Sequence, residues 1–390
     1  MTNITKTFKY IRKGFRKPKK KIGVNYWRFI FNAREEITAA EKSFFIELEC
    51  INPSLSPSLP LLGFKPRVKI SEDDLQYVLA GTDSAKKLET ESIIKPSYCC
   101  IRVGMVGKNS KQICEYHALH DCVLKQLPFQ ISLGNTSFSE SQISGNVEVS
   151  EEELKEHPEY LCNAGSASWN INYELDTSFL EGYSASSAKW FPCGCLAKFS
   201  GSLVFDGISY IIDPKHSYGY SDRYLGKLFP QKWFHISSNN LVSNISGKLL
   251  FDSSFVVQGE FSNRVSFLGN FEGLPIVFAA DSGKKKYSCV WDCLQSPEGS
   301  EDENKLHWSI SVHNKIYVID IDVYCDIKDL FNRKLELPQG HRKVMNLLEG
   351  FNGTGEIKLY KKNRKTLEQI EFVKIEKAVC EFGEVEEADF

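Results

Sequence analysis

The sequence predicts an all-β protein with two domains, on three observations. Short segments in which apolar and polar residues alternate follow one another along most of the chain, and strands have this period of two. Turn residues such as Asp206-Gly207 separate the segments at short intervals, which is typical of antiparallel sandwiches or barrels. A chain of 390 residues is also too long for one ordinary core and fits two domains of similar size.

The expected strands cover both halves of the chain. The three prolines in 52–60 exclude that segment from a strand interior, because proline has no backbone donor, so we predict a loop there. The predicted strands are 26–31, 43–51, 98–106, 112–118, 128–133, 168–175, 196–205, 208–212, 233–238, 254–261, 265–271, 287–294, 307–312, 316–324, 355–360 and 367–379.

Only a few short helices are expected. Serine followed three residues later by an acid is the pattern of a helix N-terminus, because the serine oxygen accepts a hydrogen bond from a free backbone donor. This pattern predicts two helices, and a third is placed ahead of Gly350. The predicted helices cover 71–80, a short segment that opens with Ser150 and Glu153, and 341–348.

Composition gives the chain no global preference for a charged partner. Lysine and arginine number 48 against 50 for aspartate and glutamate, so no nucleic acid partner is expected. The longest apolar runs fall far short of the ~20 residues of a membrane-spanning helix, and the Met1 end has no apolar signal core. We therefore predict a cytoplasmic protein. Its twelve cysteines lack the spacing of a secreted disulfide scaffold and are expected to be reduced.

The two ends of the chain carry opposite charges. Segment 6–21 holds nine lysine and arginine residues and no acid. Such a run is typical of a solvated tail, and it also suits weak contact with an anionic membrane surface. The expected organisation is a basic flexible tail (1–21), an N-terminal β-barrel domain (22–228), a C-terminal β-barrel domain (229–384) and an acidic tail (385–390).

The stretch most informative about function is 219–240, which is expected to bend at Gly226 and to break at Pro230. Opposite charges beside aromatic rings suit a partly buried polar site, where a cation and an apolar wall shift the pKa of an acid. A strand connection with solvated charges and core aromatics is the other interpretation, and both are open. The polar cluster consists of Tyr220, Asp222, Arg223 and Tyr224.

Segment 305–324 is predicted to be a hairpin with one apolar and one polar face. If Asn314 and Lys315 form a two-residue turn, His307 lies opposite Asp322 on the polar face. A histidine that faces an aspartate suits proton transfer, so this is a second candidate pair. The other interpretation is a wet sheet face whose polar residues are there for solvation.

The cysteines do not form a recognisable metal site. Cys289 and Cys293 would lie roughly 13 Å apart on a strand, too far for a bridge, and the sequence nominates no further ligands beside Cys193 and Cys195. Zinc spacings, phosphate loops, dinucleotide fingerprints and nucleophile elbows do not occur in the sequence. We therefore assign no metal and no nucleotide cofactor; the adjacent pair Cys99-Cys100 stays without a role.

Four parts of the chain have the order and spacing of a known family: 26–29, 199–210, 219–233 and the strand that ends near Gly383. In these parts the chain resembles the tocopherol cyclase-like family and, beside it, the wider group of carotenoid hydratases and lipocalin-like proteins. Leu225 stands where the family tends to have tryptophan. The residues that match the family's central block are Gly219, Tyr220, Asp222, Arg223, Gly226, Phe229, Pro230 and Trp233.

The resemblance implies two successive lipocalin-like β-barrels whose facing cavity holds an apolar isoprenoid. It also implies protonation of an alkene, followed by capture of the carbocation by a phenol or water. Such a site needs a protonated carboxylic acid, aromatic or anionic groups near the cation, and exclusion of stray water. The roles it implies are catalytic for Asp222 (the acid), Tyr220 (a cation stabiliser) and His235 (a second proton carrier), and ligand-binding for Arg223, Tyr224, Trp233, Phe229 and Trp27.

Other interpretations stay open. Arg223 lies next to Asp222, and an adjacent cation lowers the pKa of an acid, so a pair between them would make Asp222 structural and place the proton donor elsewhere. The same fold also suits a non-catalytic carrier of a lipid or small molecule. A peripheral scaffold that uses the basic arm 6–21 is the third possibility.

Overall fold

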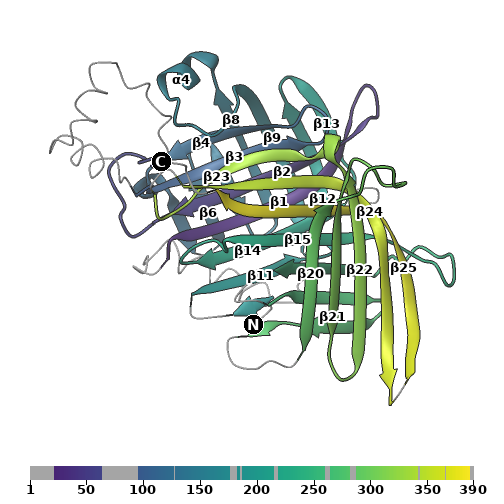
Figure 1. Ribbon diagram of the computed structural model, residues 1–390. Coiled ribbons are helices and arrows are strands. Elements are labelled where there is room, and N and C mark those ends of the chain that lie inside the picture. The colour runs from purple at the N-terminus through teal and green to yellow at the C-terminus, as the bar shows by residue number, and fades with distance from the viewer. Residues whose placement is uncertain are drawn as a thin grey trace.

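The structure is a computed structural model that describes residues 22–63, 95–126, 128–175, 182–184, 187–214, 218–259, 264–281, 287–340, 343–364 and 366–386. Strands dominate this part of the chain and form two large, almost entirely antiparallel sheets (Figure 1), which confirms the predicted all-β class. The predicted basic tail 1–21 and helix 71–80 lie outside the described residues, as do residues 387–390 of the acidic tail.

The first sheet contains fifteen strands, and all but one of them come from the first part of the chain. The exception, β19, pairs in parallel with β10. The strands are β1 (Val24–Glu35), β2 (Glu41–Ile51), β3 (Tyr98–Val106), β4 (Lys111–His117), β5 (Val123–Gln126), β6 (Phe129–Leu133), β7 (Thr136–Ser139), β8 (Gln142–Val149), β9 (Gly165–Glu174), β10 (Tyr183–Ser184), β11 (Ala188–Gly194), β12 (Lys198–Phe205), β13 (Ile208–Ile212), β14 (Gly219–Gly226) and β19 (Ala280–Asp281).

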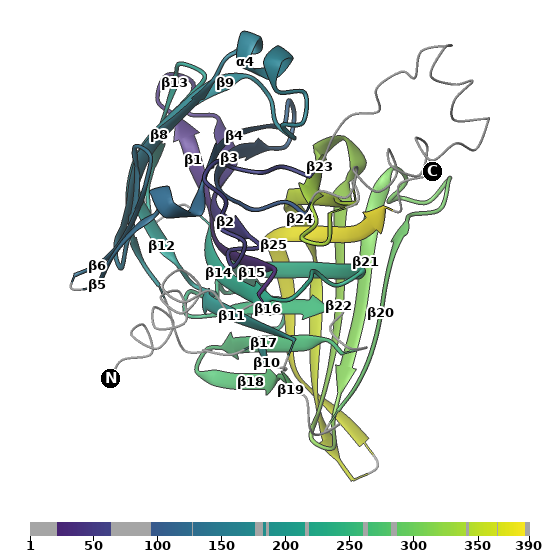
Figure 2. The same ribbon diagram turned by 90° about the vertical axis from the view of Figure 1, so that its left-hand side faces the viewer.

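The second sheet contains ten strands. Figure 2 shows β15 and β25 of this sheet beside β1, β2 and β14 of the first, and both sheets curl into half-barrels. The strands are β15 (Lys232–Ser243), β16 (Ser254–Gly259), β17 (Ser266–Phe271), β18 (Leu274–Phe278), β20 (Ser288–Gln295), β21 (Lys305–His313), β22 (Tyr317–Asp326), β23 (Phe331–Glu336), β24 (Val344–Asn363) and β25 (Thr366–Glu386).

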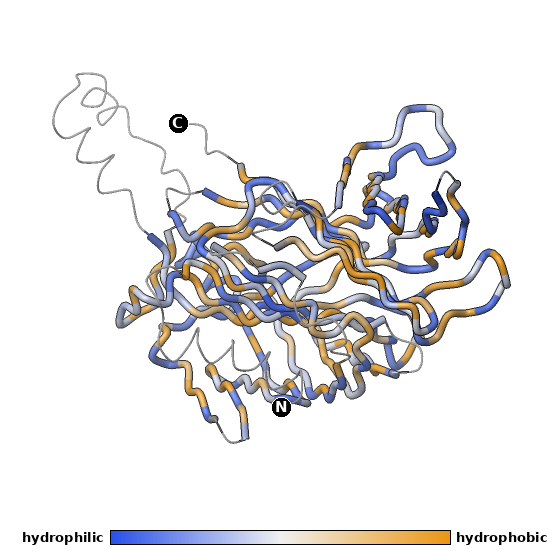
Figure 3. Tube along the Cα trace, turned by 90° about the horizontal axis from the view of Figure 1, so that it is seen from below, coloured by the Kyte–Doolittle hydropathy of each residue, from blue (hydrophilic) through white to orange (hydrophobic). Residues whose placement is uncertain are grey.

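Alternating side chains divide the interior into three layers. One face of the first sheet encloses a core that includes Trp27 and Phe29, and one face of the second encloses a core that includes Phe255 and Trp308. The other buried faces of the two sheets meet in a third layer, which we call the inter-sheet layer. Because successive residues of a strand point to opposite faces, β1 contributes to two of these layers. Hydropathy accordingly alternates along the strands (Figure 3).

The short helix at Ser150 and the loop at 52–60 are confirmed. Ser150 Oγ accepts a hydrogen bond from the Glu153 amide at 3.0 Å and caps α4 (Glu151–Glu156). The helix predicted over 341–348 is wrong, because Val344 opens β24, a strand of 20 residues that pairs with β25 along its length. Pairing with so long a neighbour overrides a weak local preference for a helix.

The predicted hairpin forms with its faces as expected, but its register differs by two residues. Asp322 lies opposite Ser309 instead of opposite His307 in the pairing of β21 with β22. Asn314 Oδ1 accepts hydrogen bonds from the backbone amides of Ile316 and Tyr317. These bonds give a turn longer than the expected two residues. The shift is even, so every side chain keeps its predicted face.

Candidate functional site

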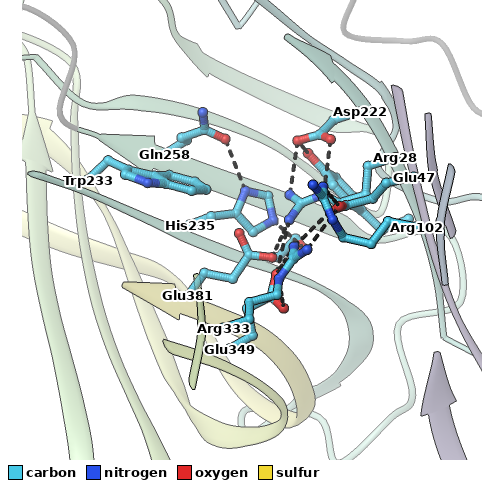
Figure 4. Close-up of polar contacts among 12 residues, drawn as sticks. Arg28, Glu47, Arg102, Asp222, Trp233, His235, Gln258, Arg333, Glu349 and Glu381 are labelled. Carbon is cyan, nitrogen blue, oxygen red and sulfur yellow. Dashed lines mark hydrogen bonds and ion pairs between the residues drawn. The ribbon is translucent and has the colours of Figure 1, made fainter. Parts of the chain in front are cut away.

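Eight charged side chains from seven strands are buried together in the inter-sheet layer, and Figure 4 labels all of them except Glu49. None of them is more than 6% exposed. Buried charges are costly unless they are paired and hydrogen-bonded, so their partners define what this layer can do. The set, which we call the inter-sheet network, consists of Arg28, Glu47, Glu49, Arg102, Asp222, Arg333, Glu349 and Glu381.

Asp222 is held by four donors, and its cation is Arg28 rather than the adjacent Arg223. Its carboxylate accepts hydrogen bonds from Arg28 Nε and Nη2, both at 3.2 Å. It also accepts from Trp190 Nε1 at 3.0 Å and from the Tyr220 hydroxyl at 3.1 Å. Neighbouring residues of β14 point to opposite faces, so Arg223 turns away from Asp222. Oδ2 accepts three of these four hydrogen bonds and Oδ1 accepts one.

Arg333 joins acids that belong to the two sheets. Its Nη1 and Nη2 donate to the two oxygens of Glu47 at 2.9 and 2.8 Å, and Nη2 also donates to Glu349 at 2.7 Å. Arg102 donates to Glu47 at 3.0 Å and to Glu49 at 2.8 Å. Burial opposes ionisation of Glu47, but the charges of Arg333 and Arg102 outweigh burial and lower the pKa of Glu47 to about 2. This part of the network is a chain of fixed ion pairs.

Glu381 is one of three acids of the network, with Glu49 and Glu349, whose pKa burial raises. Its Oε1 accepts a hydrogen bond from Arg28 Nη1, whereas its Oε2 has no hydrogen-bond partner within the described part of the chain. Burial outweighs the attraction of Arg28 and raises the pKa of Glu381 to about 8. Figure 4 shows one Glu381 oxygen directed at the arginines and the other directed away, on the side of Trp233. With three arginines and five acids in the network, a proton on Glu381 reduces the charge imbalance.

His235 lies across from this acid in the pairing of β15 with β25 and belongs to a separate hydrogen-bond chain. Its Nδ1 lies 3.2 Å from Gln258 Oε1 and its Nε2 2.9 Å from Ser237 Oγ, which is 2.5 Å from the Tyr218 hydroxyl. Burial and then the charge of Arg28 lower the pKa of His235, so the imidazole is neutral. The partners assign its tautomer: Nδ1–H donates to the amide oxygen, and Nε2 accepts from the serine.

The predicted ligand-binding residues divide between two layers. The rings of Tyr224 and Phe229 stack in the inter-sheet layer, with centroids 5.5 Å apart. Trp233 lies in the same layer and donates from Nε1 to Met345 Sδ at 2.9 Å. Trp27 packs instead in the core of the first sheet, because it occupies the alternate position on β1. The inter-sheet layer therefore unites Tyr220, Asp222, Tyr224, Phe229, Trp233 and His235, whereas the side chains of Trp27 and Arg223 lie on the other face of the first sheet.

The second candidate pair lies apart from the network, on the outer face of the second sheet. His307 Nε2 is 2.8 Å from Asp322 Oδ1. The two-residue register shift makes the two residues diagonal neighbours instead of direct partners, and their side chains still meet. The imidazole stacks on the Tyr324 ring at a centroid distance of 4.2 Å. The two side chains are 28% and 35% exposed, which is typical of a solvated sheet face.

Sequence reasoning missed most of the network. It singled out Asp222 but not Arg28, Glu349 or Glu381. The sequence did contain a signal for these residues. Each is a charged residue at a strand position that, by the period of two, points to a buried face. The described residues include no group of three or more His, Cys, Asp or Glu side chains arranged to hold a metal ion. The twelve cysteines are free thiols.

The fold and the network define a class: an all-β protein of two curled sheets with a buried arginine–carboxylate layer between them. No family model matches the chain, and no curated protein matches it. A solved structure provisionally named AttH, from Nitrosomonas europaea, is similar at 10% identity with a TM-score of 0.43, over 93% of each chain. Kievitone hydratase from Nectria haematococca is similar at 11% identity with the same TM-score, over 92% of this chain and 88% of its own.

These two likenesses concern the course of the chain. The resemblance to the tocopherol cyclase-like family and to the wider group of carotenoid hydratases and lipocalin-like proteins stays a prediction. None of the helices within the described ranges is both long and apolar enough to cross a membrane.

Proposed function

We propose that the protein is an acid catalyst that acts on a carbon–carbon double bond of a bulky apolar molecule, as an isoprenoid cyclase or hydratase does. The observation that carries the proposal is Glu381. It is fully buried, its pKa is raised to about 8, and its Oε2 has no hydrogen-bond partner among the described residues. A buried carboxylic acid that keeps its proton at neutral pH is the donor such chemistry requires.

Glu381 suits the role of proton donor better than Asp222. Both oxygens of Asp222 are engaged by Arg28, and Oδ2 also accepts hydrogen bonds from Trp190 and Tyr220. Pairing with a cation was expected to make Asp222 a structural residue and to place the proton donor elsewhere. Asp222 is paired in this way, with Arg28 in place of Arg223. Arg28 also holds Oε1 of Glu381 and leaves Oε2 to meet a substrate. We therefore assign Asp222 to positioning Arg28 and to countering positive charge.

In the proposed reaction, Glu381 gives up one proton and regains one. The Oε2–H bond of Glu381 breaks and its proton forms a new C–H bond at one alkene carbon, which leaves a carbocation at the other. The faces of Tyr220 and Trp190 and the carboxylate of Asp222 lower the energy of that cation. A phenol oxygen of the substrate or a water molecule then bonds to it, and the proton that this oxygen releases returns to Glu381.

The test is proton transfer from solvent to a neutral isoprenoid alkene. The purified protein is incubated in deuterium oxide with a hydroquinone that carries a phytyl chain, and the product is examined by mass spectrometry for one deuterium on carbon. Glu381→Gln should abolish incorporation, because the amide has no acidic proton. Glu356→Gln on the exposed side of β24 is the matched control and should retain it. Full incorporation by Glu381→Gln would exclude this residue as the donor.

A non-catalytic carrier is the second candidate, favoured by the ion pairs of Glu47, Arg333 and Arg102. Fixed pairs hold the sheets together without any need for chemistry. A carrier would release its ligand unaltered, so mass spectrometry of the molecules that co-purify with the protein separates the two functions. A retained apolar compound that is recovered unchanged after prolonged incubation would favour the carrier.

A further inference from the structure

Cys99 and Cys100, the adjacent pair in β3, point to opposite faces of the first sheet. Cys99 lies in the core of the first sheet, where its thiol contacts Cys50 and hydrogen-bonds with Cys122. Cys100 lies in the inter-sheet layer. Its thiol contacts Cys114, which in turn hydrogen-bonds with Cys162. Two groups of three thiols thus occupy the two sides of one strand.

Cys50 and Cys99 of the first group have the backbone geometry of a disulfide. Cys50 and Cys99 are direct partners in the pairing of β2 with β3. Directly opposed residues of antiparallel strands have Cα atoms about 4.5–5.5 Å apart, which lies within the range that a disulfide spans. Their Sγ atoms are 2.7 Å apart, closer than two sulfur atoms normally approach without a bond.

Cys100 and Cys114 of the second group fail the same criterion. Cys100 is paired with Tyr116, and Cys114 with Arg102, so the two cysteines are diagonal neighbours. Diagonal neighbours have Cα atoms about 7–8 Å apart, beyond what a disulfide spans without movement of the backbone. The pairs Cys50–Cys99 and Cys100–Cys114 are therefore a matched comparison on the two faces of β3.

Cys122 gives the first group a route to solvent. Cys50 and Cys99 are fully buried, whereas Cys122 is partly exposed. The three thiols form a line from the surface inward: Cys122, then Cys99, then Cys50. An oxidant can reach the outer thiol, and thiol–disulfide exchange can carry the bond to the inner pair.

We propose that Cys50 and Cys99 form a reversible disulfide site that oxidants of the peroxide class reach through Cys122. Hydrogen peroxide oxidises Cys122 to a sulfenic acid and releases one water. The Cys99 thiol displaces the hydroxyl, which gives a Cys99–Cys122 disulfide and a second water. Cys50 then attacks Cys99, the Cys122 thiol is regenerated, and the Cys50–Cys99 disulfide remains. In sum, two thiols and one peroxide give one disulfide and two waters.

The raised pKa values of the thiols limit the rate at which the disulfide forms. Burial raises the pKa of Cys50, and the hydrogen bond to Cys99 together with burial raises that of Cys122, so thiolate is scarce. The disulfide therefore forms slowly and records sustained oxidation. The disulfide would also affect the inter-sheet network, because the other face of β2 and β3 carries the ion pair of Glu49 with Arg102. A covalent link between these strands fixes the spacing of that part of the network.

The experiment treats the full-length protein with hydrogen peroxide, blocks the remaining thiols with an alkylating reagent and maps linked peptides by mass spectrometry. We expect a loss of two of the twelve free thiols, a peptide that joins Cys50 to Cys99, and recovery of both thiols with dithiothreitol. Cys122→Ser should slow formation several-fold and leave the same final link. Cys50→Ser should shift the link to Cys99–Cys122. Cys100→Ser is the control on the adjacent residue and should change neither rate nor product.

The map of the wild-type protein decides the proposal without any variant. Recovery of Cys50 and Cys99 as alkylated thiols after peroxide treatment would overturn it, and so would a link within Cys100, Cys114 and Cys162 in place of the expected one. An undiminished rate in Cys122→Ser would overturn the entry route. None of these outcomes bears on proton donation by Glu381, so the two proposals fail separately.

Discussion

Arg28 of β1 and Glu381 of β25 share a buried hydrogen bond although 353 positions separate them in the chain. The same guanidinium holds Asp222 through two further donors, so one side chain of the first sheet binds acids of both sheets. Removing one partner of such a group leaves unpaired charge in a medium that solvates it poorly. The layer between the sheets depends on Arg28 for that reason.

Replacement of Arg28 should therefore be severe. Arg28→Met leaves Asp222 and Glu381 buried without their cation, and we expect the free energy of unfolding to fall by about 3–5 kcal/mol. Urea titration followed by circular dichroism measures the loss. Lys328→Met removes a cation that is 77% exposed beside Asp326 and should change little. Equal losses in the two variants would show that the inter-sheet network does not hold the sheets together.

Glu381 should make stability fall as the pH rises. The pKa of Glu381 is about 8 in the folded protein, against an ordinary value of 4.5 for a glutamate. Between these values the folded state binds a proton that the unfolded state has released, so the free energy of unfolding decreases from about pH 5 to about pH 8. The decrease is on the order of 3 kcal/mol. Glu381→Gln should flatten this part of the profile in urea titrations at pH 5, 6.5 and 8. An unchanged slope would contradict the raised pKa.

Gly383 should not tolerate a side chain. A Cβ at this position would lie 2.1 Å from Trp233 Nε1, so Gly383→Ala must displace the indole from its contact with Met345. We expect a loss of roughly 1–3 kcal/mol and a changed tryptophan fluorescence spectrum. Gly194→Ala is the milder comparison, because its nearest contact is the flexible end of Leu175 at 2.9 Å. A larger loss in Gly194→Ala would contradict the packing.

His307 and Asp322 should matter little to either stability or turnover. Each is partly exposed, and exposed pairs contribute about 0.2–1 kcal/mol. We expect His307→Asn and Asp322→Asn to unfold near the wild-type urea midpoint and to keep full deuterium incorporation. If either variant loses incorporation while the midpoint holds, the outer face of the second sheet carries the chemistry instead of the inter-sheet layer.

The hairpin at 305–324 illustrates how far sequence reasoning reaches. Alternation placed His307 and Asp322 on one face and Trp308 on the other, and the structure agrees. The register was wrong by two residues, because Asn314 accepts hydrogen bonds from two amides of the turn and lengthens it. Turn geometry depends on such local contacts, which periodicity does not report.

Alternation along the chain was sufficient to predict the class of fold and the buried face of each strand, and the stretch 219–240 brought Tyr220, Asp222, Trp233 and His235 into one region. Which charges meet depends on the packing of the two sheets. Asp222 pairs with Arg28 across 194 positions rather than with Arg223 beside it, and burial raises the pKa of Glu381 to about 8. The physical reason is that a strand's period selects the face of a residue, whereas its partner across the layer depends on how two whole sheets stack.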